Sequence, residues 1–165
     1  MPGPQNPLAF RDMTTHEPAR SPEQRKQDVL TRLEKDADAW IATASSSGEP
    51  HLMPLSFVWE HDSLLMCTRS TNPTLRNLES GNRTVQVTLG HTRDVVHITG
   101  TATVFPSGEL PTASADAFAA KLIWDPRDSG PSYAYFRVVP QRIQAWRELN
   151  EIPGRDLMSE GAWLV

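Results

Sequence analysis

Frequent turn-forming residues limit this chain to short, regularly interrupted elements. Between residues 40 and 105, stretches that alternate apolar and polar residues are separated by Gly, Pro, Asn or Asp. Such alternation is typical of strands that bury one face. We predict strands at residues 40–44, 51–59, 64–68, 84–89, 95–105, 133–139 and 142–146, with Pro140 separating the last two. Short connections favour antiparallel neighbours, so the pattern predicts a mainly β protein built as a six- to seven-stranded antiparallel barrel.

A few short helices are expected between these strands. Ser21, followed by Pro22 and by Gln24 three residues on, forms a capping box that opens a helix over residues 22–38. Pro73 suits the first turn of a helix over residues 71–80. An Ala-rich segment predicts a third helix over residues 112–124, which the following Asp-Pro pair ends.

Composition indicates one domain preceded by a tail. Residues 1–20 contain four prolines and no periodic apolar pattern, so we expect a disordered tail at 1–20 and a single domain at 21–165. The tail lacks the apolar run of a signal peptide, and nowhere is a membrane-spanning length of apolar residues present. Cys67 is the only cysteine, which excludes an intrachain disulfide and favours the cytoplasm.

Charge and motif content narrow the function. The chain has 16 basic and 20 acidic residues and no basic run, so nucleic acid is not an expected partner. It lacks a phosphate-binding loop, HExxH, GxSxG and GxGxxG. The five histidines form no spaced pair of the kind that binds zinc. We therefore expect no metal site and can name no catalytic residue.

Five segments, in a fixed order along the chain, carry a resemblance to a known family. They are SGEPHLMPLSFVW at residues 47–59, LLMCT at 64–68 and PTLRNL at 73–78, followed by TRDVVHITGTA at 92–102 and PQRIQAW at 140–146. In this order they resemble the pyridoxamine 5'-phosphate oxidase-like family, the FMN-binding split barrels that include flavin- and deazaflavin-dependent oxidoreductases. The resemblance spans residues 37–146, with a weaker match at Gly154 and Arg155. It implies a split barrel that acts as a homodimer with flavin-type cofactor sites at the subunit interface.

The resemblance also assigns cofactor-binding residues. In relatives, the positions of Met53, Leu55 and Ser56 lie beside the cofactor ring, and those of Cys67 and Thr68 hold its phosphate or ribityl hydroxyls. Pro73, Thr74, Arg76 and Asn77 match the helix start that binds the phosphate, which the helix dipole also favours. Arg93 and Asp94 match positions near the ring or phosphate edge, while Trp146 and Arg155 match residues supplied by the partner subunit. Residue chemistry alone leaves alternatives: Leu55 and Trp146 as core, Arg93 as a surface residue, and Asp94 as a turn residue or an orienting partner for Arg93.

The lack of a positive charge at Thr74 affects which cofactor is expected. Relatives usually carry Lys or Arg at this position, and this chain does not. The phosphate of FMN carries nearly two charges and the phosphodiester of deazaflavin coenzyme F-420 carries one, so the missing cation favours coenzyme F-420, with FMN as the alternative. The implied function is an oxidoreductase that transfers hydride between this cofactor and a small organic acceptor.

Two other functions stay open on the sequence. One is an FMN-dependent oxidase or reductase of the pyridoxamine phosphate oxidase type. The other is a non-catalytic flavin- or tetrapyrrole-binding protein, in which His51, His91 or His97 would ligate a haem iron.

Overall fold

The structure is a computed structural model that describes residues 17–165. Most of the predicted tail lies outside these residues. The strands are β1 (Asp38–Ala44), β2 (Pro50–Glu60), β3 (Ser63–Arg69), β4 (Thr84–Leu89), β5 (Val95–Val104), β6 (Tyr133–Trp146), β7 (Asp156–Ser159) and β8 (Ala162–Trp163). The α-helices are α1 (Pro22–Lys35), α2 (Pro73–Glu79) and α3 (Thr112–Leu122), and two 3₁₀ segments are η1 (Pro126–Ser132) and η2 (Leu149–Glu151). No helix within residues 17–165 has the length and apolar content to cross a membrane.

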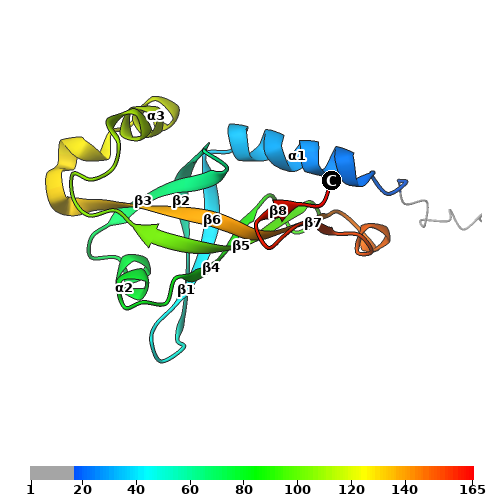
Figure 1. Cartoon of the computed structure of the whole chain (residues 1–165), viewed down its shortest axis with the longest axis horizontal. Helices are drawn as coiled ribbons and strands as arrows, with labels where there is room; N and C mark the ends of the chain where they lie inside the picture. The colour runs from blue at the N-terminus through cyan, green and yellow to red at the C-terminus, as the bar shows by residue number, and fades with distance from the viewer. Residues whose placement is uncertain (1–16) are drawn as a thin grey trace, which may run out of the picture.

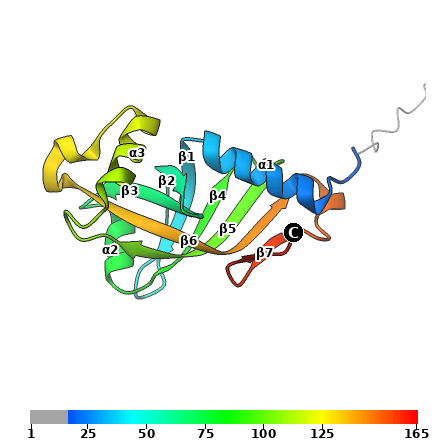
Figure 2. The same ribbon diagram turned by 45° about the horizontal axis from the view of Figure 1, so that its top comes forward.

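Six of the strands close into an antiparallel barrel. Their hydrogen-bonded order runs β3-β2-β1-β4-β5-β6, and an additional pairing between β3 and β6 completes the circle. α1 lies along one side of the barrel and α2 covers the opposite end, as Figures 1 and 2 show. The predicted fold class, a mainly β split barrel with a few helices, is confirmed.

The barrel interior is a continuous apolar core. Inward-facing residues of successive strands, such as Ile41, Phe57, Ile98, Phe136 and Ile143, have no exposed surface. Alternate residues face outward, which is the period-two pattern the sequence predicted. Val29 and Leu33 of α1 complete the core on one side, where the helix packs against β2, β6 and β7.

One predicted interruption is wrong. Pro140 does not separate two strands, because β6 runs unbroken from Tyr133 to Trp146. Gly100 of β5 lies opposite Pro140, and the register between the two strands shifts at this point. Proline has no N–H to donate, so it is tolerated in a strand where a bulge interrupts the hydrogen-bond ladder. Pro140 lies at such a bulge, and β6 continues through it.

The C-terminal segment is more ordered than expected. β7 pairs with β6, and β8 pairs with β7, so two strands extend the sheet beyond the barrel. The sequence contains no long alternating run here, and these strands are only four and two residues long. Arg155 is anchored within one chain, because its backbone C=O accepts a hydrogen bond from the Ala145 N–H at 3.0 Å.

α1 is clamped to this C-terminal segment by buried ion pairs. Glu151, which is 3% exposed, accepts hydrogen bonds from the Arg20 guanidinium at 2.7 and 3.0 Å and from the Arg147 backbone N–H at 2.8 Å. Arg25, also buried, donates to the backbone C=O of Glu151 and Gly154. Hydrogen bonds from Arg20 hold the pKa of Glu151 at about 2, below its usual 4.5, against the opposing effect of burial.

We predict that Gly100→Ala destabilises the protein by about 1–3 kcal/mol, the usual cost of overpacking. A Cβ atom at this position would lie 2.6 Å from Cγ1 of Val138 and 2.9 Å from the backbone oxygen of Val139, so the bulge would have to shift. Urea unfolding measures the loss. Thr101→Ala, at the exposed neighbouring position, is the control and should change stability little. Equal stability of the Gly100 variant and wild type would contradict the packing argument.

We also predict that Glu151→Gln lowers the free energy of unfolding at pH 7 by about 2–3 kcal/mol, since each unit of pKa shift is worth about 1.4 kcal/mol. Because the folded-state pKa lies below the unfolded value, this stabilisation is present above about pH 4.5 and is lost as the pH falls toward 2. Thermal melts between pH 2 and 7 should show a shallower decline for the variant. Parallel curves for the two proteins would show that Glu151 is not the titrating group.

Candidate functional site

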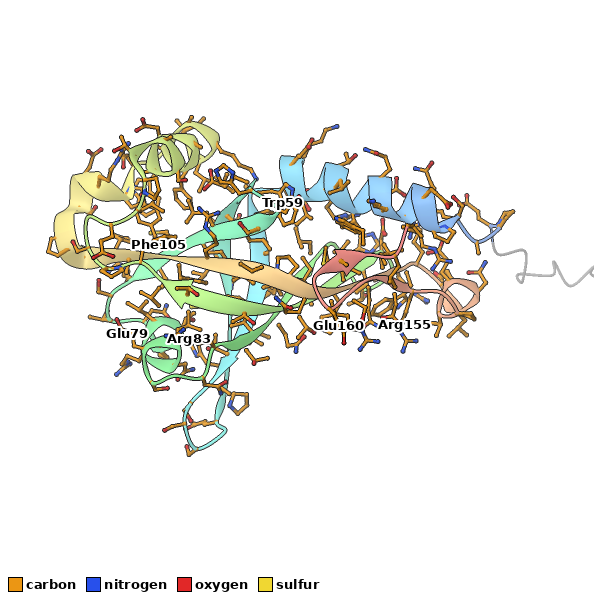
Figure 3. All side chains as sticks on the ribbon, in the orientation of Figure 1. Trp59, Glu79, Arg83, Phe105, Arg155 and Glu160 are labelled. Carbon is orange, nitrogen blue, oxygen red and sulfur yellow. The ribbon has the colours of Figure 1, made fainter. Side chains whose placement is uncertain are left out.

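The predicted cofactor-binding residues separate into two groups. The α2 group comprises Met53, Leu55, Ser56, Cys67, Thr68, Pro73, Thr74, Arg76 and Asn77, which lie on β2, on β3 and on α2. The β6 group comprises Arg93, Asp94, Trp146 and Arg155, near the start of β5 and the end of β6. Figure 3 shows Arg83, just after α2, and Arg155 well apart along the molecule.

Strand register shows how far apart the groups lie. Thr68 pairs with Ala134, at the start of β6, and Trp146 is the last residue of the same strand. A strand rises about 3.3 Å per residue, so these positions are about 40 Å apart along β6. Thr68 and Trp146 are therefore too far apart to share one site within a single chain, although Met53 is level with Ile143 in the strand register.

The backbone N–H of Thr74, at the start of α2, is already hydrogen-bonded within this chain. The Asn72 side chain accepts a hydrogen bond from the Thr74 N–H at 2.9 Å, which caps the helix, and its amide contacts Sδ of Met53 at 2.9 Å. Thr74 has no exposed surface, and its Oγ1 has no hydrogen-bond partner. Asn77 donates to Oγ1 of Thr43, also at 2.9 Å. Arg76 is the one charged residue of the α2 group, and its side chain is exposed.

Several other side chains of the α2 group face the interior. Leu55 and Thr68 are buried, whereas Ser56 is partly exposed and donates to the exposed Asp38 at 2.6 Å. Cys67 is buried beneath α3, and this burial raises the pKa of its thiol to about 12. The thiol is therefore neutral near pH 7 and is not a nucleophile.

Part of β2 has backbone N–H and C=O groups that do not pair with β3. Residues 50–56 pair with β1, but the pairing with β3 begins only at Phe57. This gap is the split in the barrel, and it leaves part of one edge of β2 without a strand partner. Unpaired strand edges are strong hydrogen-bonding surfaces. The arrangement fits the role that the resemblance implies for Met53 and Leu55, which is to present backbone groups to a planar polar ligand.

Within the β6 group, Asp94 is surrounded by arginines that do not belong to the group. Its carboxylate lies 2.9 Å from the Arg32 guanidinium, 3.4 Å from that of Arg147 and 4.0 Å from that of Arg20. Gly90 permits this approach, because a Cβ atom there would lie 2.5 Å from Nη1 of Arg32. The suggestion that Asp94 orients Arg93 is wrong, since Arg93 pairs with Glu148 at 3.0 Å instead.

Sequence reasoning missed the arginines around Asp94. Arg20, Arg32 and Arg147 are far apart in the chain, and no local pattern relates them to Asp94. Together they line a pocket of about 360 Å³ beside α1. Trp146 follows Ala145 of this pocket and is half-buried on the outer face of the sheet.

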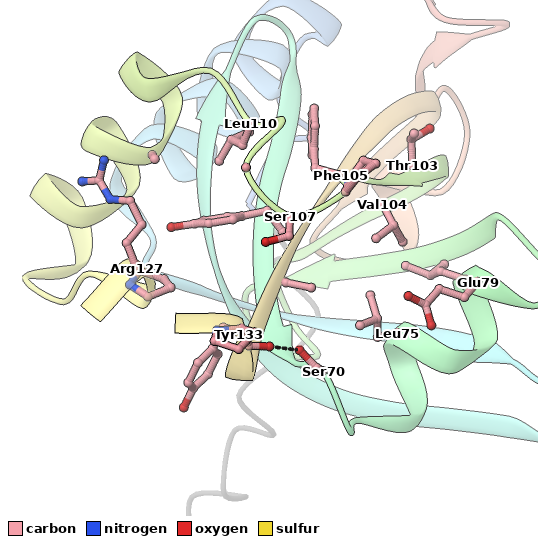
Figure 4. Close-up of a pocket in the computed structure, with 18 of the residues that line it drawn as sticks. Ser70, Leu75, Glu79, Thr103, Val104, Phe105, Ser107, Leu110, Arg127 and Tyr133 are labelled. Carbon is pink, nitrogen blue, oxygen red and sulfur yellow. Dashed lines mark hydrogen bonds between the residues drawn. The ribbon is translucent and has the colours of Figure 1, made fainter. Parts of the chain in front are cut away.

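A second pocket, of about 640 Å³, lies between α2 and the connection from β5 to β6 (Figure 4). None of the predicted cofactor-binding residues lines it. Among residues 17–165, no group of three or more His, Cys, Asp or Glu side chains is arranged to hold a metal ion.

Comparison with known proteins identifies the family. Residues 26–149 match the family model described as pyridoxamine 5'-phosphate oxidase. The chain belongs to the pyridoxamine 5'-phosphate oxidase family. The resemblance inferred from the ordered sequence segments is thereby confirmed. No protein of curated function matches the sequence.

Solved structures that share the fold have differing described roles. A Listeria innocua protein described as a pyridoxamine 5'-phosphate oxidase is 18% identical, with a TM-score of 0.60 over 76% of this chain and 98% of that one. A protein described as an F-420 reductase is 17% identical, with a TM-score of 0.54 over 68% and 93%. HutZ, the haem storage protein of Vibrio cholerae, is 14% identical, with a TM-score of 0.62 over 84% and 99%. At these identities the likeness shows the fold alone.

Proposed function

We propose that two copies of this chain form a homodimer that binds a flavin-type cofactor between them and transfers hydride to or from a small organic molecule. One observation carries the proposal: Thr68 of the α2 group and Trp146 of the β6 group lie about 40 Å apart along β6 in one chain, so a site that uses both needs residues from two chains. The bound cofactor supplies the redox chemistry, and the protein supplies binding and orientation.

The outer face of β1 and β2 is suited to be the shared surface. Trp40 is 49% exposed and Leu52 is 61% exposed, although both lie on regular strands. Trp40 pairs with Pro54, and Ala42 pairs with Leu52, so the four side chains form an apolar patch on neighbouring strands. Exposed apolar patches of this kind mark interaction surfaces. The patch adjoins the unpaired edge of β2, which places the proposed interface next to the backbone groups that would face the ring.

Charge at α2 favours coenzyme F-420 over FMN. A phosphate near the start of α2 would find the Thr74 N–H already capped by Asn72 and the Thr74 side chain buried. Arg76 is the cation of the α2 group that is free to approach, since it forms no ion pair within the described residues. One guanidinium balances the single charge of a phosphodiester better than the nearly double charge of a phosphate monoester.

Haem binding is a second candidate, and one observation favours it. Nε2 of His51 is buried without a hydrogen-bond partner among the described residues. His51 pairs with Thr43 of β1, which accepts a hydrogen bond from Asn77 of α2, so the imidazole lies near α2. An imidazole nitrogen of this kind can ligate iron. The similarity to HutZ, the haem storage protein, supports testing this ligand as well.

Absorption titrations of the purified protein with coenzyme F-420, FMN and haemin separate these candidates. We expect saturable binding of coenzyme F-420 at one molecule per chain, weaker binding of FMN, and no sharp Soret band with haemin. Saturable haemin binding that His51→Ala abolishes, without binding of either flavin, would replace the oxidoreductase proposal with the haem one.

We predict that Trp40→Glu shifts the protein from dimer to monomer and weakens cofactor binding at least tenfold. A carboxylate in the apolar patch would remove buried apolar area and leave a charge to be desolvated at the interface. Light scattering and cofactor titration measure the two effects. Ile123→Glu, at an apolar residue that is 93% exposed at the end of α3, should leave both unchanged. A monomeric variant that still binds cofactor with wild-type affinity would refute the shared site.

We predict that Arg76→Gln weakens binding of coenzyme F-420 more than tenfold without lowering the melting temperature. A hydrogen bond to a charged group is worth about 1.5–3 kcal/mol, whereas Arg76 is exposed and forms no ion pair in the described chain. Arg142→Gln, at an exposed arginine on β6, is the matched control and should bind normally. Unchanged affinity of the Arg76 variant would place the phosphate elsewhere.

A further inference from the structure

The connection between β5 and β6 is far longer than the topology requires. These strands are antiparallel neighbours, which a two-residue turn can join. Here residues 105–132 intervene, and they contain α3 and η1. In Figure 1 this segment projects beyond the barrel on the same side of the molecule as α2. The barrel does not need residues 105–132, so this segment can form a separate feature beside it.

This connection and α2 enclose the 640 Å³ pocket. The volume lies within the range of small-molecule sites, about 300–1,000 Å³. Apolar and aromatic side chains dominate the lining, which includes Leu75 and Leu78 of α2, Phe105 and Leu110 of the connection, and Tyr133 and Tyr135 of β6. Figure 4 shows Leu75, Phe105, Leu110 and Tyr133 on different sides of the cavity. Three aromatic rings in one pocket favour a planar aromatic ligand.

The walls of the pocket are held in place by their own packing. Phe118 of α3 is fully buried against Val58, Leu65 and Cys67, so the connection has a small core of its own. The Phe118 ring packs edge-on against Tyr135, with centroids 5.5 Å apart. Likewise, Trp124 packs edge-on against Tyr133 at 4.9 Å. A pocket with such walls is pre-formed, which reduces the entropy cost of binding.

The charged groups around the pocket sum to one negative charge. Arg127 is neutralised by Asp116 at 2.8 Å and by Asp125 at 2.6 Å. Glu79 and Arg83 are one acid and one base beside α2 (Figure 3), and neither forms an ion pair within residues 17–165. The carboxylates that carry this charge are partly exposed, so water screens them, and a ligand with a net charge would lose hydration on entering the apolar interior. The hydroxyl of Ser107 lines the same pocket and can pair with one polar atom of a neutral ligand.

We propose that this pocket binds a planar aromatic molecule that carries no net charge and one hydroxyl or carbonyl group. The site is separate from the proposed cofactor site, because it shares no residue with the α2 group or the β6 group. It exists within one chain and does not require the dimer. A ligand can therefore be tested here on the protein without a bound flavin.

The first test uses three probes with the same naphthalene body. Calorimetric titration of the full-length protein, without cofactor, with 2-naphthol should give saturable binding at one molecule per chain. 2-Naphthoate and 2-naphthylmethylammonium, which carry one charge of either sign, should bind at least fivefold more weakly. No saturation by 2-naphthol, or tighter binding of either charged probe, would overturn the proposal.

The second test locates the site. Ser107→Trp places a large ring in the pocket from an exposed loop position, so we expect at least a tenfold loss of 2-naphthol affinity with an unchanged melting temperature. Ser159→Trp, at an exposed serine on β7, is the matched control and should bind normally. Wild-type affinity in the Ser107 variant would place the ligand elsewhere.

The third test addresses charge. Glu79→Gln removes the acid at the rim, so 2-naphthoate should gain affinity severalfold at low salt while 2-naphthol is unaffected. A loss of 2-naphthol affinity in this variant would show that the ligand hydroxyl donates to Glu79, which would overturn the assignment of its polar contact to Ser107.

Discussion

β6 pairs with β3, β5 and β7, and no other strand in the described chain has three partners. Its first half closes the barrel against β3, and its second half supports the C-terminal strands. A proline in the middle of so central a strand would normally break the ladder. The bulge opposite Gly100 absorbs it, so one strand can span both ends of the molecule. The separation of the two predicted residue groups follows directly from this continuity.

The two ends of β6 have contrasting chemistry. At the C-terminal end, Arg20 and Arg25 secure α1 to residues 147–155, and Asp94 is surrounded by guanidinium groups. At the N-terminal end, charges are sparse or neutralised, and aromatic side chains line a pocket. In the proposed dimer, the charged end of one chain would meet the unpaired β2 edge of the other. The aromatic pocket would stay within each chain, which explains how two ligands of different character could bind without competing.

Family membership leaves considerable freedom of function. Structures with this fold are described as an oxidase, a reductase and a haem storage protein. A shared barrel is compatible with all three, because function resides in the residues placed on it. In this chain the decisive positions are Thr74, which is a buried neutral residue, and Arg76, which is exposed and free to contact a ligand. In the proposed cofactor site they would favour a singly charged phosphate group over a doubly charged one.

The sequence by itself determined the local features. Alternation predicted the strand at residues 84–89 to the residue, and Ser21 with Pro22 located the start of α1, because these signals depend only on near neighbours. The ordered segments between residues 47 and 146 sufficed for the family and hence for the barrel. Tertiary structure alone decided which distant residues meet. Arg20, Arg32 and Arg147 converge on Asp94 only because α1 docks beside the end of β6, and the pocket exists only because residues 105–132 fold back toward α2. Pairing between residues far apart in the chain leaves no periodic signal, so neither arrangement could be inferred from local pattern.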